Sequence, residues 1–202
     1  MAVRLLAAWL LVGSVGYWAA PGIAAVGAPV VVDAFRFLHP DLLVELLPLS
    51  AQPGKLRLSV TLVQAVKLDA TSAIPGGSRL TLETGLLHAL LPAVLLISLS
   101  LAMPMNAPRL RAAALLLALL MGVTLAGALL VGQWSGLLQL NVQSAAEQAG
   151  LARTAPWSLE LLMFLEGGAR WLIALVLGVV PTSLVARWSS KAAHRLTKLS
   201  RQ

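Results

Sequence analysis

Four apolar segments divide this chain, and each is long enough to cross a lipid bilayer. They lie near residues 5–27, 86–105, 112–132 and 161–186. A membrane-spanning helix needs about 20 mainly apolar residues, and helices satisfy their backbone polar groups internally. The sequence therefore predicts an α-helical membrane protein with four transmembrane helices.

Basic residues are distributed unevenly around these segments. Eight of the 15 Lys and Arg residues have no acid near them and lie at the first end, in the turn between the second and third segments, and in the tail: Arg4, Arg109, Arg111, Arg187, Lys191, Arg195, Lys198 and Arg201. The other seven share the remaining stretches with all eight Asp and Glu residues. The positive-inside rule then predicts an N-in/C-in topology, with both termini in the cytoplasm. Eleven Arg against four Lys, with Ala, Leu, Val and Gly dominant, suit a bacterium, and the expected location is the bacterial inner (cytoplasmic) membrane.

Composition excludes several classes of function. The net charge is +7, but the excess lies beside membrane segments without interleaved aromatic residues, so we expect contact with the lipid bilayer and no nucleic acid. The chain has no cysteine, which excludes disulfides and a Cys nucleophile. No metal-ligand spacing connects His39, His88 and His194. We therefore expect no metal, no cofactor and no catalytic residue.

The pattern predicts four regions along the chain. Residues 1–27 form the first transmembrane helix, for which an uncleaved anchor is favoured over a signal peptide because a proline would follow the available cleavage sites. Residues 28–84 form an extracytoplasmic insert with short strands. Residues 85–186 carry the other three helices with an outer loop at 133–158, and residues 187–202 form a basic cytoplasmic tail.

The insert combines two local patterns. Residues after Pro40 and Asp41 favour a short amphipathic helix with leucines at 42, 43, 46 and 47. From Lys55 to Leu62 apolar and polar residues alternate, which is typical of a half-buried strand, and 79–83 alternate again. We expect a hairpin or a three-stranded sheet, with Arg57, Ser59 and Thr61 on an edge strand that contacts a partner.

Two groups of residues within the apolar segments are candidates for a role. Glu166 and Arg170 lie four apart, so a continuous helix would place them on one face, and His88 lies near the start of the second segment. They can form a structural pair, an interfacial pair without a special role, or a contact with a partner or substrate. A row of small residues favours close helix packing in lipid: Ala114, Ala118, Gly122 and Ala126.

Several motifs together resemble a family of bacterial membrane proteins. They are Tyr17-Trp18 followed by Ala20-Pro21, the turn from Met103 to Arg111, Gln133-Trp134, and Glu166-Gly167-Gly168 before Pro181. The chain resembles the exosortase-associated membrane proteins, most of all the exosortase H-associated type. The resemblance implies an accessory protein with no established activity of its own, beside an exosortase-type membrane transpeptidase that processes C-terminal sorting signals.

The favoured function is thus a non-catalytic accessory subunit of a cell-envelope protein-sorting or export system. Two alternatives stay open. One is a small membrane enzyme or transporter subunit that uses Glu166, Arg170 and His88. The other is an assembly factor of another membrane complex.

Overall fold

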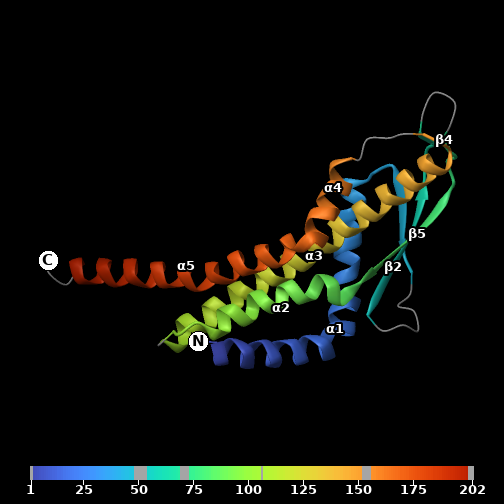
Figure 1. The fold of residues 1–202 in the computed structure, drawn as a ribbon. Helices are drawn as coiled ribbons and strands as arrows, with labels where there is room; N and C mark the ends of the chain where they lie inside the picture. Colours follow the sequence, from blue (N-terminus) through green and yellow to red (C-terminus); the bar gives the residue numbers. More distant parts are fainter. Residues whose placement is uncertain (1, 48–53, 69–72, 106, 152–155, 200–202) are drawn as a thin grey trace. The chain divides into compact units, whose positions relative to one another are not determined.

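A computed structural model describes residues 2–47, 54–68, 73–105, 107–151 and 156–199 of the chain, with side chains to residue 185. The expected outer loop at 133–158 and the tail are therefore described only in part. The chain forms two compact units: one contains residues 1–17, 90–126 and 170–202, and the other contains residues 18–89 and 127–169. Figure 1 shows the elements along the chain.

Three helical stretches are long and apolar enough to cross a membrane. They are helix α1 (Ala2–Leu38), helix α3 (Pro108–Gln148) and the stretch Trp157–Val185. Helix α2 (Leu86–Ala102) is apolar but has only 17 residues. The structure thus supports a helical membrane protein, as predicted.

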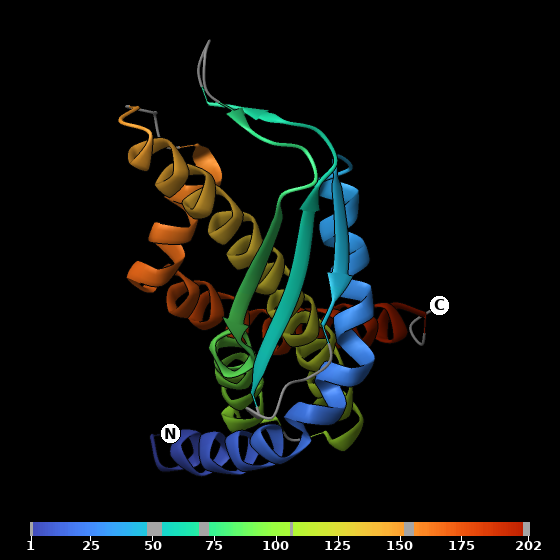
Figure 2. The same ribbon diagram turned by 90° about the vertical axis from the view of Figure 1, so that its right-hand side faces the viewer.

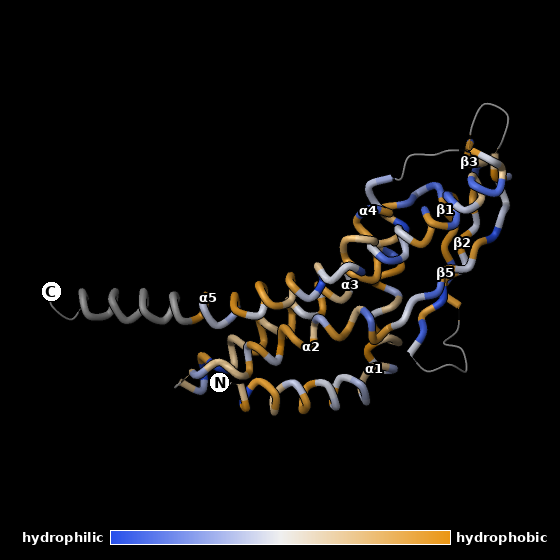
Figure 3. The backbone as a smooth tube through the Cα atoms, viewed as in Figure 1, coloured by the Kyte–Doolittle hydropathy of each residue, from blue (hydrophilic) through white to orange (hydrophobic). Residues whose placement is uncertain are grey.

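Much of the apolar side-chain surface of these helices is exposed. Large exposed side chains recur along α1, α3 and the last helix, as in Leu10, Leu120 and Val176. Figure 3 shows the same helices coloured mainly as hydrophobic. Soluble proteins rarely expose such extended apolar surface, whereas lipid tails cover it without penalty.

The unit that contains residues 90–126 is built from closely packed helices. All four small residues of the expected packing row are buried, and a side chain at Gly122 would lie 3.3 Å from Ile97 of α2. Helix α5 (Arg170–Leu199) comes still closer to α2, because a Cβ atom at Gly178 would lie 2.7 Å from Leu99. Ser100 also donates a hydrogen bond to the carbonyl of Gly178 at 3.0 Å.

The other unit contains a three-stranded antiparallel sheet in the order β1-β2-β5. Strand β1 is Leu42–Leu46, β2 is Lys55–Leu62 and β5 is Arg79–Gly85, and a separate pair joins β3 (Val66–Lys67) to β4 (Ala73–Ile74). The even-numbered residues of β2 are buried, as the alternation predicted. Phe35 of α1 and Trp134 of α3 add a core contact, with ring centroids 5.9 Å apart.

The edge-strand prediction for Arg57, Ser59 and Thr61 is wrong. Strand β2 is the central strand, since it pairs with β1 from Leu42↔Leu62 onward and with β5 from Lys55↔Gly85 onward (Figure 2). Both of its backbone borders are therefore occupied, and Ser59 is buried. The alternating pattern identified the strand, but it contains no information about its neighbours.

Three local boundaries also differ from the predictions. Residues 42–46 form strand β1 rather than a helix, because pairing with β2 satisfies their backbone groups. Helix α1 continues past Pro21 and Pro29. Helix α3 runs without a break to Gln148 and ends where Gly150 has a φ of 74°, so residues 133–148 belong to this helix and not to the expected outer loop.

Candidate functional site

Four polar side chains form a continuous line of hydrogen bonds within the unit that contains the sheet. The Thr84 hydroxyl donates to Oε1 of Gln133 at 2.6 Å, and Nε2 of Gln133 donates to Oε1 of Glu166 at 3.2 Å. The other carboxylate oxygen, Oε2, lies 2.7 Å from Nε2 of His88. We call Thr84, Gln133, Glu166 and His88 the polar quartet.

The local structure explains how these four side chains meet. Strand β5 ends at Gly85 and α2 begins at Leu86, so Thr84 and His88 stand on either side of one strand-to-helix junction. Glu166 lies in η1 (Leu165–Ala169), a short kinked segment that follows helix α4 (Trp157–Phe164). Gly168 in this segment has a φ of 114°, a conformation that favours glycine.

The polar quartet runs from the protein interior to the surface. Thr84 and Gln133 are buried, whereas the side chains of His88 and Glu166 are 44% and 40% exposed. A buried amide or hydroxyl is costly unless it is hydrogen-bonded, so the inner pair holds its geometry firmly. The inner pair thereby fixes the position of the half-exposed carboxylate.

The geometry also determines which nitrogen of His88 is available. An ionised carboxylate only accepts hydrogen bonds, so Nε2 of His88 must donate, and Nδ1 of the neutral ring is then an acceptor. Among the residues that the structure describes, no hydrogen bond reaches Nδ1. An imidazole oriented by a carboxylate can accept a hydrogen bond from a partner, take up a proton, or bind a metal.

A metal site would need ligands from elsewhere. Within the described ranges, no three His, Asp or Glu side chains group closely enough to hold a metal ion. His88 and Glu166 are two groups, and protein zinc sites use three or four protein ligands.

The structure brings the predicted site residues His88 and Glu166 into direct contact. They are separated by 78 residues in the sequence. Arg170 begins α5, where it is buried and its guanidinium lies 5.7 Å from the ring centre of Trp171. A kink at Gly168 lies between Glu166 and Arg170, so the two residues do not stand on one continuous regular helix as the sequence suggested.

Sequence reasoning missed the two buried members of the quartet. Gln133 follows the apolar segment 112–132 directly, where the sequence predicts the start of an outer loop. Its neighbour Trp134 is fully buried, so this part of α3 lies in the protein interior. A buried position beside a tryptophan would have indicated a hydrogen-bonded role for the amide, but burial is not visible in the sequence.

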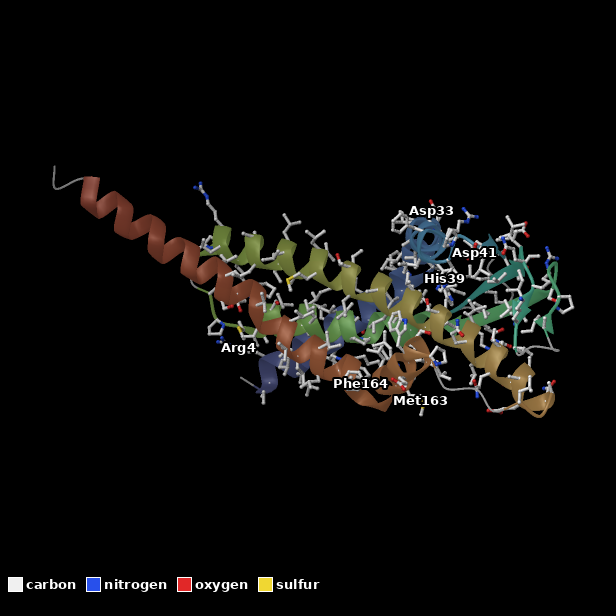
Figure 4. The ribbon with its side chains drawn as sticks, turned by 90° about the horizontal axis from the view of Figure 1, so that it is seen from above. Arg4, Asp33, His39, Asp41, Met163 and Phe164 are labelled. Carbon is white, nitrogen blue, oxygen red and sulfur yellow. The ribbon has the colours of Figure 1, made fainter. Side chains whose placement is uncertain are left out.

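A second polar contact lies near the junction of α1 and β1. Nε2 of His39 lies 2.9 Å from the Ser135 hydroxyl, and the His39 ring packs on Phe35 at 4.7 Å. Figure 4 labels His39 near Asp33 and Asp41. Burial lowers the pKa of His39 below its ordinary value of 6.5. The contact is part of the core beside Trp134 rather than of the quartet.

On the sheet, the charged side chains pair with one another. Glu83 of β5 contacts Lys55 at 2.5 Å and Arg57 at 2.6 Å, both from β2. These hydrogen bonds, from Lys55 first and Arg57 second, lower the pKa of Glu83. Arg57 thus contributes to cross-strand pairing inside the sheet.

Comparison with known proteins adds no relationship. No protein-family model matches the chain, and no curated protein or solved structure matches it either. The fold and the quartet define the class to which it belongs: a helical membrane protein with a small antiparallel sheet and one hydrogen-bonded polar site.

Proposed function

We propose that this protein is a non-catalytic accessory subunit of a cell-envelope protein-sorting or export system, whose partner is an exosortase-type transpeptidase. It spans the bacterial inner membrane four times, because α2 crosses in addition to the three long apolar stretches, and both termini lie in the cytoplasm. The sheet then lies on the extracytoplasmic side. The distribution of the basic residues supports this orientation.

The observation that carries the proposal is the half-exposed end of the polar quartet. His88 presents an oriented acceptor nitrogen, and buried Thr84 and Gln133 hold Glu166 behind it. A contact that is already ordered before binding loses little entropy on association. The quartet therefore suits recognition of a hydrogen-bond donor on another membrane protein.

The first test is capture of the partner from cells. A photo-crosslinking residue replaces Leu87, which is exposed beside His88, and in the control it replaces exposed Val63, which follows the opposite end of β2. The tagged full-length protein is purified in mild detergent and its adducts are identified by mass spectrometry. We expect position 87, and not position 63, to capture a membrane transpeptidase. Recovery of the protein without an adduct at either position contradicts the proposal.

A pair of variants tests the role of the quartet in binding. Gln133→Ala removes the amide that positions Glu166. Asn141→Ala on the same helix removes only a hydrogen bond from the side chain to the backbone carbonyl of Leu137. We expect the first variant to lose the co-purifying transpeptidase and the second to retain it at equal protein abundance. Retention by both variants excludes the quartet as the contact.

A second candidate function rests on the same geometry. The 2.7 Å contact between His88 and Glu166 leaves Nδ1 able to take up a proton, as a general base does. For a membrane enzyme, His88→Ala abolishes the cellular function while the partner still co-purifies. For an accessory subunit or an assembly factor, the same variant loses the partner, or the partner's abundance falls.

A further inference from the structure

The two borders of the three-stranded sheet differ in whether their backbone groups are satisfied. On the β1 border, the carbonyl of Val44 faces away from β2 and accepts hydrogen bonds from Arg36 at 2.6 Å and 3.2 Å. An arginine from the end of α1 thus closes this border to another strand. Proteins protect edge strands in this way because an open edge pairs readily with other chains.

The β5 border is open. The backbone N–H of Leu86 donates to the carbonyl of Gly54, and the backbone N–H of Leu62 donates to the carbonyl of Ser78. In an antiparallel pair every second residue bonds across to its neighbour, so the even-numbered residues of β5 bond to β2. The backbone groups of Arg79, Thr81 and Glu83 therefore point outward. Arg79 and Thr81 are exposed, and within the described residues no hydrogen bond reaches the backbone of Thr81.

We propose that a second copy of this chain occupies the open border. The two β5 strands pair antiparallel about a two-fold axis at Thr81, which joins the two sheets into one sheet of six strands. Symmetric pairing of the same surface on both copies is the commonest form of dimer. This inference is independent of the proposed function.

Charge complementarity selects the register of this pairing. Only outward-facing residues can exchange backbone hydrogen bonds, so odd-numbered residues of the two strands must oppose one another. With Thr81 on the axis, Arg79 of each copy faces Glu83 of the other. A shift by two residues in either direction places Arg79 opposite Thr81 or Gly85 and loses both opposite-charge pairs.

The existing contacts of these residues permit the new pairs. Arg79 contacts Glu45 at 3.4 Å, but both side chains are about two-thirds exposed, and such surface pairs are weak. Lys55 and Arg57 contact different oxygens of Glu83, and a carboxylate has about four acceptor positions. Glu83 can therefore accept a further donor from the second copy.

The absence of cysteine from the chain allows a direct test of the register. Paired Cα atoms at such positions lie about 5.5 Å apart, which is within the range of a disulfide. Thr81→Cys should therefore give a disulfide-linked dimer of the full-length protein in detergent on mild oxidation. Arg79→Cys and Glu83→Cys should each give no disulfide-linked dimer alone, because each position faces the other, and a mixture of the two should form a disulfide-linked mixed dimer.

Charge reversal tests the same pairs without a covalent link. Arg79→Glu places like charges opposite each other twice and should weaken the dimer roughly tenfold in light scattering of the detergent-solubilised protein. Combining it with Glu83→Arg should restore the dimer. The proposal is overturned if Thr81→Cys gives no dimer, if Arg79→Cys alone crosslinks as efficiently, or if the Thr81→Cys variant in cells captures a different protein instead of its own copy.

Discussion

At the scale of single residues, His39 combines partial burial with a protonation equilibrium near neutral pH. Burial lowers its pKa below 6.5, so the folded protein keeps the ring neutral where the unfolded chain already binds a proton. The unfolded state therefore binds more protons in this range, and stability must fall as the pH drops below about 6.5. At pH 7.5 the effect is absent, because both states are neutral.

We expect the thermal midpoint of the detergent-solubilised protein to be lower at pH 5.5 than at pH 7.5. His39→Gln replaces the imidazole with an amide that does not titrate, so this variant should show a smaller decrease. Differential scanning fluorimetry at the two pH values measures both. An unchanged decrease in the variant would assign the pH dependence to other groups.

At the scale of elements, α3 packs so closely against α4 at Gly136 that no Cβ atom fits there. A Cβ atom at Gly136 would lie 2.5 Å from Leu162, whereas at Gly132, one turn earlier, it would lie 3.7 Å from Leu165. The first distance requires the backbones to move apart, and the second is an ordinary contact. The two glycines therefore form a matched pair on one helix.

Gly136→Ala should destabilise the protein by about 1–3 kcal/mol, as overpacking of a close contact does. Gly132→Ala should be neutral or stabilising, because alanine is favoured over glycine within a helix by up to about 1 kcal/mol. Denaturant unfolding in mixed micelles, followed by tryptophan fluorescence, compares them. Equal changes in the free energy of unfolding for both substitutions would show that the contact with Leu162 does not limit how closely α3 packs against α4.

At the scale of the whole molecule, α2 decides the number of membrane crossings. Its 17 residues span about 25 Å, close to the lower limit for crossing the hydrocarbon core. Helix α3, with 41 residues, is about twice as long as a crossing requires. If α2 crosses, the sheet and the turn after α2 lie on opposite sides of the membrane.

Single cysteines introduced into this Cys-free chain test the topology. We expect Val63→Cys to react with a membrane-impermeant maleimide in spheroplasts, while Ala107→Cys and Ser189→Cys should react only after permeabilisation. The reason is the excess of basic residues around the last two positions. Labelling of Ala107→Cys in intact spheroplasts would show that α2 does not cross.

The sequence by itself determined the features that depend on local pattern. Hydropathy identified the apolar helices, and alternation located the strand from Lys55 to Leu62. The leucines at 42–46 fit a short helix or a strand equally well, because a short apolar run does not distinguish the two. Pairing with β2, up to 20 residues away in the register, decided in favour of the strand.

Only the tertiary structure decided which residues meet. The sequence contains His88 and Glu166 as candidates, but their contact, and the buried Gln133 and Thr84 behind them, depend on three separate stretches of chain folding together. The central position of β2 and the open border of β5 likewise depend on distant pairing. Periodicity and hydropathy describe neighbours along the chain, whereas strand order and side-chain hydrogen bonds are properties of contacts between distant residues.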